Sequence, residues 1–519
     1  MPSEGRRLSL VVRADATPAV GAGHFMRCLA LAEGCVARGG DATFVTRCGS
    51  EALLARAKAA GVIVDLLPLE GSVEEEMEAL RAAVSRPPER RRARWVVLDG
   101  YGYGPEYQRA VREMGARTLV LDDTAHQPAY ETDVLLNQNL DATHREYPVQ
   151  PGTVLLLGTR FALLRREFLP WGVAERPVRR TAERILVTLG GADPGNQTPG
   201  VLEGIARAGI SMEEVRVMVG PANPHRAPLE AWIASSDLPV TLLDGGPRMP
   251  EQMAWADLAV SASGSTSWEL SFMGVPSILV TAAENQAAIA RGLDALGAAR
   301  SIGAVADPDA IAAAVKELAA DREARRTMGA RGRELVDGRG VERVLNVLGT
   351  LSAGASGNRI ILRRAAPADA LDLLRIANDP GVRANAFNPH PIPLESHLRW
   401  YARKLESADT AIWVIELAGV VAAHVRYDRM EDGETAEIGY AVSSAFRGMG
   451  LGTRILELTW RMACQVLGVS AVRGVVIQGN TASVRAFEKA GFRGAGETEM
   501  HGRACLAFER RLAAAVGAA

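Results

Sequence analysis

The sequence has few cysteines, almost no net charge and no long hydrophobic segment. Its five cysteines are an odd number without paired spacing, which predicts reduced thiols and a cytoplasmic location. Cys28, Cys35 and Cys48 lack the CxxC spacing of zinc ligands, so we expect them to be small core residues. No apolar run reaches the roughly 18–20 residues that span a membrane, and the N-terminal apolar stretch is too short for a secretory signal. A net charge of −2 gives no indication of binding to nucleic acid or to a membrane.

The length is that of a globular protein with several domains. The 519 residues are far more than one hydrophobic core usually serves, so we expect about three domains. We place these domains at residues 1–176, 177–350 and 359–513. The small residues LSAGASGN, at 351–358, are predicted to form a flexible linker.

The first domain is organised around residues 20–40, VGAGHFMRCLALAEGCVARGG, which follow an apolar run at 8–12. Gly21 and Gly23 allow a tight turn and a close approach to a ligand. Apolar residues then recur at helical spacing, so a helix is expected to begin near His24. A helix N-terminus suits an anion, which places His24 where a phosphorylated substrate would arrive. Histidine also takes a proton readily near neutral pH.

Short apolar runs alternate with helical patterns in this domain, which predicts a parallel sheet with helices on both faces. The strands are expected at 8–12, 42–46, 95–99 and 117–122. Polar residues stand at or just after the strand ends: Arg13, Asp15, Asp99, Tyr101, Asp122 and Asp123. Ligands bind beyond the carboxyl ends of such strands, so His24, Tyr101 and Asp122 are expected to line one crevice. The alternative for the aspartates is helix or turn capping.

A second α/β pattern begins with the strand RILVTLGG, whose glycines Gly190 and Gly191 suggest a loop close to a ligand. A later strand ends in SASGSTSWEL, residues 261–270. Gly264, Ser265 and Thr266 precede a helix there, and backbone N–H groups and hydroxyls at such a turn can hold a diphosphate without a metal. Glu269, one turn into the helix, could accept hydrogen bonds from a ribose diol. The alternative is an ordinary Ser/Thr cap with Glu at the third helical position.

Several motifs occur in the order found in one known family. They are RADATPAVGAGHFMRCLALA, VVLDGYG, LLGTRFALLRREF, VTLGGADPGN, SASGSTSWEL and AENQ. Together they resemble the hydrolases of pseudaminic acid synthesis, which cleave UDP from UDP-2,4-diacetamido-2,4,6-trideoxy-β-L-altropyranose. Spore-coat polysaccharide proteins share these motifs. The resemblance covers about residues 8–350 and implies two Rossmann-like domains of the glycosyltransferase-B type that need no metal.

The resemblance also implies residue roles. His24 is expected to activate the attacking water as general base, while Tyr101 and Asn285 hold the water and the sugar. Gly264 to Thr266 would take the diphosphate and Glu269 the ribose. The other predicted substrate-binding residues are Arg13, Asp15, Gly21, Gly23, Arg27, Gly190, Gly191, Ser265 and Gln286. The rival interpretation is a glycosyltransferase, in which an acceptor replaces water.

The C-terminal region has a different pattern of strands and helices. A pair of strands is expected to turn near Ala418 and Gly419, and RGMGLGTRILELTW then opens a helix with glycines. Free N–H groups at this helix start suit a pyrophosphate. With GNTASVRAFEKAGF, this segment resembles the GNAT acetyltransferases over about residues 359–513. The resemblance implies acetyl-CoA binding by Arg447, Gly448, Gly450, Gly452, Thr453, Asn480 and Ser483; the alternative is a plain glycine-capped helix.

One position departs from the GNAT pattern. Many of these enzymes have a tyrosine that protonates the departing thiolate, and Phe487 stands at the corresponding position here. Glu437 is the candidate base, through water, with a solvated strand residue as the alternative. His424 is a weaker candidate, and we expect it to be a hydrogen-bonded strand histidine. Phe487 keeps open a further interpretation, a nucleotide-sugar sensor whose GNAT domain only binds CoA.

The two resemblances together imply consecutive enzymes in one chain. The acetyltransferase would N-acetylate the 4-amino group of a UDP-linked amino sugar, and the hydrolase would then release UDP. The predicted partners are therefore UDP-linked amino sugars, acetyl-CoA and other enzymes of the same pathway, with no nucleic acid and no membrane.

Overall fold

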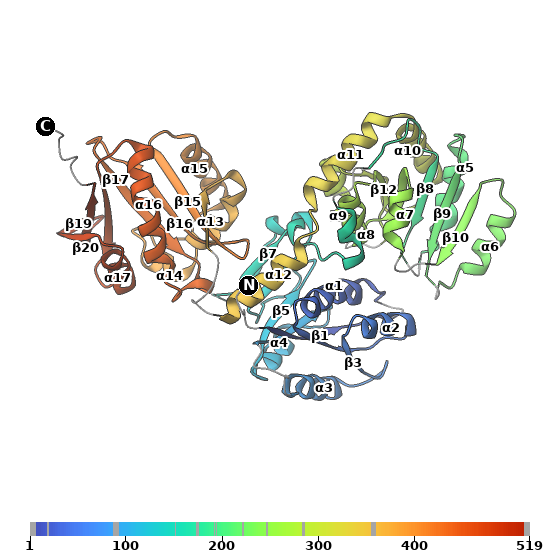
Figure 1. Ribbon diagram of the computed structural model, residues 1–519, viewed down its shortest axis with the longest axis horizontal. Coiled ribbons are helices and arrows are strands. Elements are labelled where there is room, and N and C mark those ends of the chain that lie inside the picture. Colours follow the sequence, from blue (N-terminus) through green and yellow to red (C-terminus); the bar gives the residue numbers. More distant parts are fainter. Residues whose placement is uncertain are drawn as a thin grey trace. The chain divides into compact units, whose positions relative to one another are not determined.

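The computed structural model describes residues 7–17, 20–86, 93–150, 152–172, 176–190, 193, 195–220, 223–244, 248–282, 286–353 and 360–512. The chain divides into two compact units (Figure 1): Arg7–Val149 with Leu155–Leu345 form the first, and Asn346–Ala519 make up most of the second. The first unit contains two sheets with parallel strands, and the second contains one mixed sheet. The predicted fold class, two Rossmann-like domains followed by a third α/β domain, is confirmed.

The first sheet has the strand order β3-β2-β1-β4-β5-β6-β7. Its strands are β1 (Leu8–Ala14), β2 (Asp41–Thr46), β3 (Ile63–Leu66), β4 (Ala93–Asp99), β5 (Arg117–Leu121), β6 (Val134–Asn137) and β7 (Val154–Leu157). Helices α1 (Gly23–Ala37) and α2 (Glu51–Ala59) cover one face, and α3 (Val73–Ser85) and α4 (Pro105–Arg112) cover the other (Figure 1). All four strands predicted for this domain are present.

The strand order of the first sheet fixes where a ligand can bind. The chain runs from β1 to β2 and β3 on one side of the sheet, and from β4 to β5 and β6 on the other. A crevice therefore opens between the carboxyl ends of β1 and β4. The register pairs Ala14 with Asp99, so the two strands end at the same level. The loop that carries His24 follows β1, and Asp99 closes β4. Two segments far apart in sequence therefore meet at this point.

The second sheet repeats this arrangement with the order β10-β9-β8-β11-β12-β13. Its strands are β8 (Arg184–Thr188), β9 (Glu214–Val219), β10 (Val240–Asp244), β11 (Leu258–Ala262), β12 (Ser277–Val280) and β13 (Arg300–Ser301). Its helices are α5 (Thr198–Arg207), α6 (Arg226–Ala234), α7 (Met249–Trp255), α8 (Thr266–Met273), α9 (Ala287–Ala295), α10 (Pro308–Ala320) and α11 (Arg322–Leu335). The direction reverses between β8 and β11, which are the strands that precede the two predicted nucleotide loops.

Helix α12 (Gly340–Ala353) runs further than the sequence predicts. Its first residue, Gly340, is forced by packing, because an added Cβ would lie 2.1 Å from the carbonyl oxygen of Ala162. The helix continues to Ala353, so the first three residues of the predicted linker, 351–353, are helical. The remaining linker residues, 354–358, lie outside the described residues.

The third sheet has the order β14-β15-β16-β17-β18-β20-β19. Its strands are β14 (Ile360–Arg364), β15 (Thr410–Leu417), β16 (Val420–Arg429), β17 (Thr435–Val442), β18 (Ala471–Ile477), β19 (Arg493–Met500) and β20 (Arg503–Arg511). The predicted turn between β15 and β16 is confirmed, since Ala418 and Gly419 both have positive φ, 53° and 82°. All neighbours are antiparallel except β17 and β18, which are parallel.

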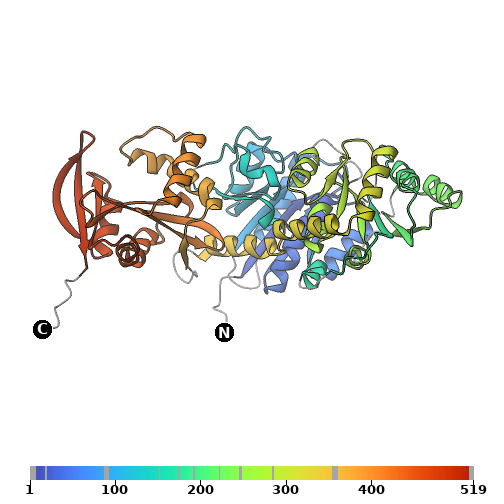
Figure 2. The ribbon, with the colours of Figure 1, turned by 90° about the horizontal axis from the view of Figure 1, so that it is seen from above.

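The helices of this unit lie on both faces of the third sheet (Figure 2). They are α13 (Ala370–Ala377), α14 (Pro380–Ala384), α15 (Leu394–Glu406), α16 (Leu451–Leu467) and α17 (Thr481–Lys489). Side chains of α13 and α15 pack on Ile412 and Val414 of β15. Helix α16 covers the opposite face, where Thr459 lies 2.9 Å from the hydroxyl of Tyr427.

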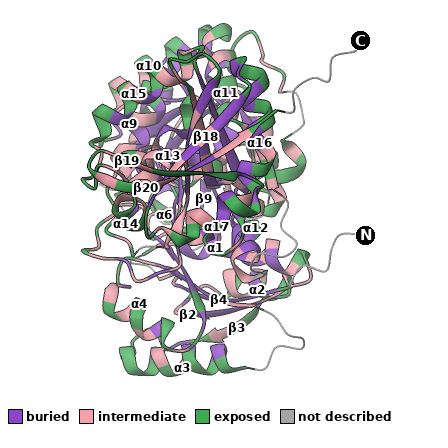
Figure 3. Ribbon diagram, turned by 90° about the vertical axis from the view of Figure 1, so that its left-hand side faces the viewer, coloured by how far each residue is buried: buried purple, intermediate pink, exposed green. Residues whose placement is uncertain are grey.

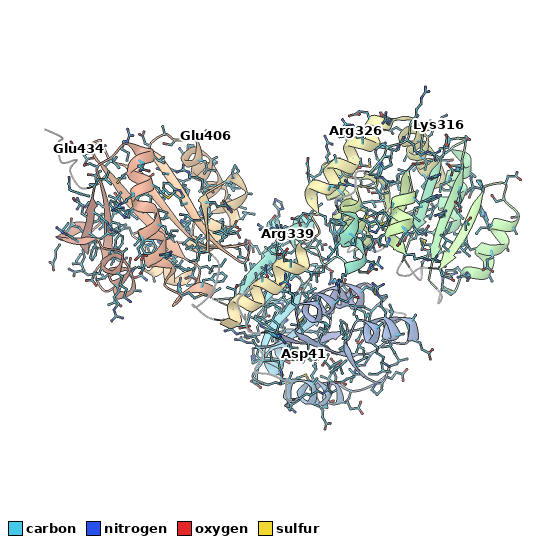
Figure 4. The ribbon with its side chains drawn as sticks, viewed as in Figure 1. Asp41, Lys316, Arg326, Arg339, Glu406 and Glu434 are labelled. Carbon is cyan, nitrogen blue, oxygen red and sulfur yellow. The ribbon has the colours of Figure 1, made fainter. Side chains whose placement is uncertain are left out.

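Burial follows these layers: strand residues are mainly buried, and outer helix faces are exposed (Figure 3). Charged side chains such as Lys316 and Arg326 project from the outer sides of α10 and α11 (Figure 4). All five cysteines are buried and free, which confirms the prediction of Cys28, Cys35 and Cys48 as core residues. Within the described ranges, no helix combines the length and apolar character that crossing a bilayer requires.

Candidate active sites

His24 is the second residue of α1 and is held by a buried carboxylate. Its Nδ1 lies 2.6 Å from Oδ1 of Asp99, whose side chain is fully buried. A carboxylate on Nδ1 favours the tautomer with its proton there, which leaves Nε2 unprotonated on the other side of the ring. The ring of Tyr101 meets His24 edge-on, with 5.2 Å between ring centroids. The structure therefore brings His24 and Tyr101 together and adds a partner, Asp99, that sequence reasoning treated only as a strand-end residue.

Asp99 is fixed by a second partner, the buried guanidinium of Arg27. Arg27 donates to both oxygens of Asp99, at 2.6 Å each, and also pairs with Asp123 at 2.7 Å. Burial acts to raise the pKa of Asp99, but Arg27 and His24 outweigh it and hold that pKa well below its usual range. Asp99 is thus an anion at neutral pH. Arg27 stays a predicted substrate ligand, although its observed contacts orient Asp99 instead.

A second histidine, His126, also contacts the ring of Tyr101. The His126 and Tyr101 ring centroids are 5.9 Å apart, and Nδ1 of His126 lies 3.0 Å from Asp122. Asp122 also accepts hydrogen bonds from the backbone N–H groups of Thr124 and Ala125. Asp122 therefore caps a turn, as the alternative interpretation held. It is connected to Tyr101 indirectly, through His126. Sequence reasoning did not single out His126, because it stands in a loop with no motif around it.

Arg13 and Asp15 lie at the end of β1 but form a buried ion network. Arg13 is 1% exposed and donates to Glu76 at 2.8 and 2.9 Å as well as to Asp15. Asp15 also accepts from the backbone N–H of Arg47. Their direct contact with a substrate stays a prediction, which this burial does not favour. Gly21, with φ of +74°, makes the turn into α1, and Gly23 is its first residue.

The second predicted loop lies at the end of β11. Ser265 precedes α8 and Thr266 begins it, with no side-chain capping bond at the N-terminus. Among the described residues, the Oγ of Ser267, 1% exposed in the first turn, has no hydrogen-bond partner. Gln286 folds toward this loop, since a Cβ on Gly264 would lie 3.4 Å from its Nε2. Within the turn, the N–H groups of Ser267 and Trp268 donate to the carbonyls of Gly264 and Ser265. Binding of a diphosphate at this helix start stays a prediction.

Glu269 is engaged in an ion pair. Its two oxygens accept from Arg165 at 2.7 and 3.0 Å. A ribose would have to share this carboxylate with Arg165. Gly190 follows β8 with φ of +90° and is exposed. The predicted residues Gly191 and Asn285 lie outside the described residues.

Two glycines at the start of α16 lie in the left-handed region of backbone conformation. Gly448 and Gly450 have φ of +79° and +73°, and no atom would meet a Cβ on either within 4 Å. The backbone before Leu451 is therefore open. Asn480 caps α17 by accepting from the N–H of Ser483 at 3.2 Å. Arg447 pairs with Asp379.

A cavity of about 1110 Å³ follows from the strand pairing. Strands β17 and β18 pair only from Thr435–Ala471 to Ile438–Gly474. Beyond this point β17 stays with β16 and β18 stays with β20, so the two strands separate. The cavity is lined by the predicted residues Glu437, Arg447, Gly448, Gly450, Gly452, Thr453, Asn480 and Ser483, and also by His424, Arg426, Tyr440 and Phe487.

Two aromatic residues, Phe487 and Tyr440, lie side by side in the lining of this cavity. Phe487 is 2% exposed and points at Gly474, since a Cβ there would lie 2.2 Å from its Cζ. Tyr440 lies edge-on to Phe487, and its hydroxyl is 3.0 Å from the Oγ of Ser483. Burial raises the pKa of Tyr440, so its hydroxyl keeps its proton at neutral pH. Tyr440 thus places a protonated hydroxyl in the cavity, which sequence reasoning missed because it stands on β17 and not on the helix.

His424 differs from its prediction. It was expected to be hydrogen-bonded, but neither ring nitrogen has a hydrogen-bond partner among the described residues, and both are buried. That expectation is wrong, because the neighbouring residues across the sheet, Val414 and Ala441, offer only apolar side chains. Glu437 lines the same cavity. Among the described residues, no cluster of three or more His, Cys, Asp or Glu side chains is arranged to hold a metal ion.

Two segments of the chain match known family profiles. Residues 185–338 match the profile described as Glycosyltransferase family 28 C-terminal domain. Residues 359–493 match the profile described as Acetyltransferase (GNAT) domain. The first segment spans the second sheet, and the second spans the glycine turn and the cavity.

Curated relatives are distant. An uncharacterized protein of Methanocaldococcus jannaschii is 23% identical over 192 residues, which cover 36% of this chain and 40% of that protein. The spore coat polysaccharide biosynthesis protein SpsG of Bacillus subtilis is 23% identical over 332 residues, covering 63% of this chain and 94% of its own length. The Helicobacter pylori protein named pseudaminic acid cytidylyltransferase and UDP-2,4-diacetamido-2,4,6-trideoxy-beta-L-altropyranose hydrolase is 20% identical over 205 residues, 39% of this chain and 37% of that protein.

The chain thus spans less than half of the Methanocaldococcus and Helicobacter proteins. The similarities confirm both resemblances drawn from the motifs. They support a nucleotide-sugar glycosyltransferase- or hydrolase-like region followed by an acetyltransferase domain.

Proposed function

We propose that the chain is a bifunctional nucleotide-sugar enzyme of pseudaminic acid synthesis. Its first unit releases UDP from UDP-2,4-diacetamido-2,4,6-trideoxy-β-L-altropyranose by attack of water on the anomeric carbon. Its second unit acetylates the 4-amino group of the UDP-linked precursor, with acetyl-CoA as co-substrate. The acetylated product of the second unit is the substrate of the first. The observation that carries the proposal is the His24–Asp99 pair at the crevice of the first sheet.

The hydrolysis needs little more than one positioned water. UDP is a good leaving group, so the oxygen of water forms the new bond as the bond from the anomeric carbon to UDP breaks. The free Nε2 of His24 takes the proton from that water, and Asp99 stabilises the imidazolium that forms. Tyr101 lies against His24 and is 45% exposed, as suits a residue that contacts the sugar. The diphosphate would lie at the start of α8, beside Gly264, Ser265 and Thr266.

The acetyl transfer uses the two sides of β17. Glu437 and Tyr440 are three positions apart on one strand, so their side chains lie on opposite faces of the sheet. Glu437 would accept a proton from the amine, through water, as nitrogen attacks the thioester carbonyl. Tyr440 would give its proton to the sulfur, directly or through Ser483, as the carbon–sulfur bond breaks. This gives the domain an acid despite Phe487, and argues for an enzyme over a CoA-binding sensor.

A coupled incubation tests the proposal. The full chain, acetyl-CoA and a UDP-4-amino-4,6-dideoxy sugar with a 2-acetamido group should yield CoA, UDP and the free diacetamido sugar. Mass spectrometry and proton NMR identify each product. If the chain releases UDP from the acetylated substrate but forms no CoA from acetyl-CoA and the amine, the proposed acetyltransferase activity is wrong. The reverse result would remove the hydrolase half.

A glycosyltransferase remains the second candidate, because the matching profile over residues 185–338 is that of a glycosyltransferase family. In that case an acceptor hydroxyl would take the place of water beside His24. Consumption of the UDP-sugar in the absence of any acceptor separates the two. Hydrolysis proceeds at full rate without an acceptor, whereas a transferase requires one.

A further inference from the structure

The cavity of the second unit has a polar wall on one face of the sheet. His424, Arg426 and Asp428 alternate along β16 and therefore share a face. Across the strand pair, Arg426 lies opposite Gly439, and Asp428 lies opposite Glu437. Gly439 is thus framed by Arg426 and, one row away on either side (about 7 Å along the strand), by Glu437 and His424. This is the face opposite Tyr440, away from the predicted proton donor to CoA.

The Nη groups of Arg426 lie at this wall, where a Cβ on Gly439 would be 3.5 Å from Nη2. Its Nε lies 2.5 Å from Asp428, and its guanidinium lies over the ring of Trp400, 5.2 Å from the centroid. Asp428 is already bonded by Lys404 at 2.7 Å. Among the described residues, nothing accepts a hydrogen bond from the Nη groups of Arg426. A guanidinium stacked on an aromatic ring with a free fork is preorganised for oxygen acceptors.

His424 adds a second unsatisfied group next to this fork. Burial lowers the pKa of His424 to about 4, and Arg426 and His397 act in the same direction, so the imidazole is neutral. A neutral imidazole offers one donor and one acceptor. Buried polar groups without partners are rare, and each calls for an explanation such as a ligand. His424 lines the cavity, so a ligand there would lie beside its ring.

We propose that His424 and Arg426 form an acceptor subsite that binds oxygen-bearing substituents of the amine substrate, such as the hydroxyl or amide groups that flank the amine of an amino sugar. The guanidinium donates to these oxygens, and the imidazole exchanges one hydrogen bond with a hydroxyl or amide. Glu437, on the other side of Gly439, then faces the amine. This inference rests on the proposed acetyl transfer and names the substrate class that the same cavity selects.

Two substitutions in the full chain test the subsite. In H424F and R426M, KM for the UDP-4-amino sugar should rise at least 10-fold, while KM for acetyl-CoA stays within 2-fold of wild type. R399Q, on the same helix as Trp400 but exposed, is the matched control and should change neither constant. If R426M does not fold, R426K keeps the charge over Trp400 without the fork and should show the same rise.

Thermal melting supplies a readout independent of turnover. H424F removes a buried group that lacks a partner, so the melting temperature of the second unit should rise. A fall, or a failure to fold, would show that His424 is structural and would overturn the subsite. Acetylation with unchanged acceptor KM in both variants would overturn it too, and would leave the proposed function intact. If no amine is acetylated by the wild type, the proposed function fails and the subsite fails with it.

Discussion

Replacing Asp99 by asparagine tests whether the His24–Asp99 pair is catalytic or only structural. Oδ1 of Asp99 accepts hydrogen bonds from Nδ1 of His24 and Nη2 of Arg27, and Oδ2 accepts one from Nε of Arg27, each at 2.6 Å. Asparagine keeps the shape but turns one oxygen into a donor, which then faces another donor. The carboxylate is fully buried, and losing one partner of a buried ion pair costs about 3–5 kcal/mol. Hydrogen exchange of peptides that cover β4 should report this loss.

The activity should fall further than the stability explains. Without the anion on Nδ1, His24 no longer holds its proton on that nitrogen, so Nε2 ceases to be a reliable base. General-base catalysis contributes roughly 10²–10⁴-fold, so D99N should lose about that factor in UDP release while the chain remains folded. The assay is UDP release by the full chain at a temperature where both proteins are folded.

Asp123 provides the matched control for this variant. It pairs with Arg27 at 2.7 Å, whereas Nδ1 of His24 pairs with Asp99. D123N should therefore remove one ion pair of the buried Arg27 guanidinium, while UDP release stays within about 3-fold of wild type. Wild-type turnover in D99N, or an equal loss of turnover in D123N, would refute the assignment of Asp99 as the residue that orients His24.

Three further predictions concern stability and the second unit. Burial would raise the pKa of Glu76, but the ion pair with Arg13 outweighs burial and lowers this pKa from 4.5 to about 2. The shift contributes about 3 kcal/mol to the free energy of unfolding at pH 7, and this stability is lost as the pH falls from about 4.5 to 2. Unfolding measured across this pH range should therefore show a smaller loss of stability in E76Q than in the wild type. In Y440F, kcat for acetyl transfer should fall at least 10-fold with unchanged acetyl-CoA affinity by calorimetry; an unchanged kcat would exclude Tyr440 as the acid. G204A should destabilise the first unit by about 1–3 kcal/mol in urea unfolding, because its Cβ would lie 2.6 Å from Ile311; neutral behaviour would mean that α5 and α10 can separate.

The sequence predicts the positions of strands and ligand loops but not the partners of individual side chains. Apolar runs and glycines mark where β1 ends and where α1 begins, so His24 could be placed in a crevice. Asp99 could not be assigned to it, because capping and pairing look alike along the chain. The choice is made by the sheet order, which sets β4 beside β1 although the two residues are 75 positions apart.

The same limit explains the result for His424. Strand alternation places His424 on a face, but whether its ring finds a partner depends on which side chains the neighbouring strands and helices present. Glu269 shows the converse, because Arg165, more than a hundred positions earlier, occupies the carboxylate predicted for ribose. Buried polar partners are set by tertiary packing, and local pattern does not carry that information.

The central claim is that His24 activates water against a UDP-linked sugar. The most direct measurement is UDP release from the diacetamido UDP-sugar, without any acceptor, by the wild type and by H24A. The account predicts rapid release of UDP and free sugar by the wild type, loss of turnover in H24A, and unchanged UDP binding by calorimetry. Wild-type turnover in H24A, or no release by the wild type until an acceptor is added, would contradict it.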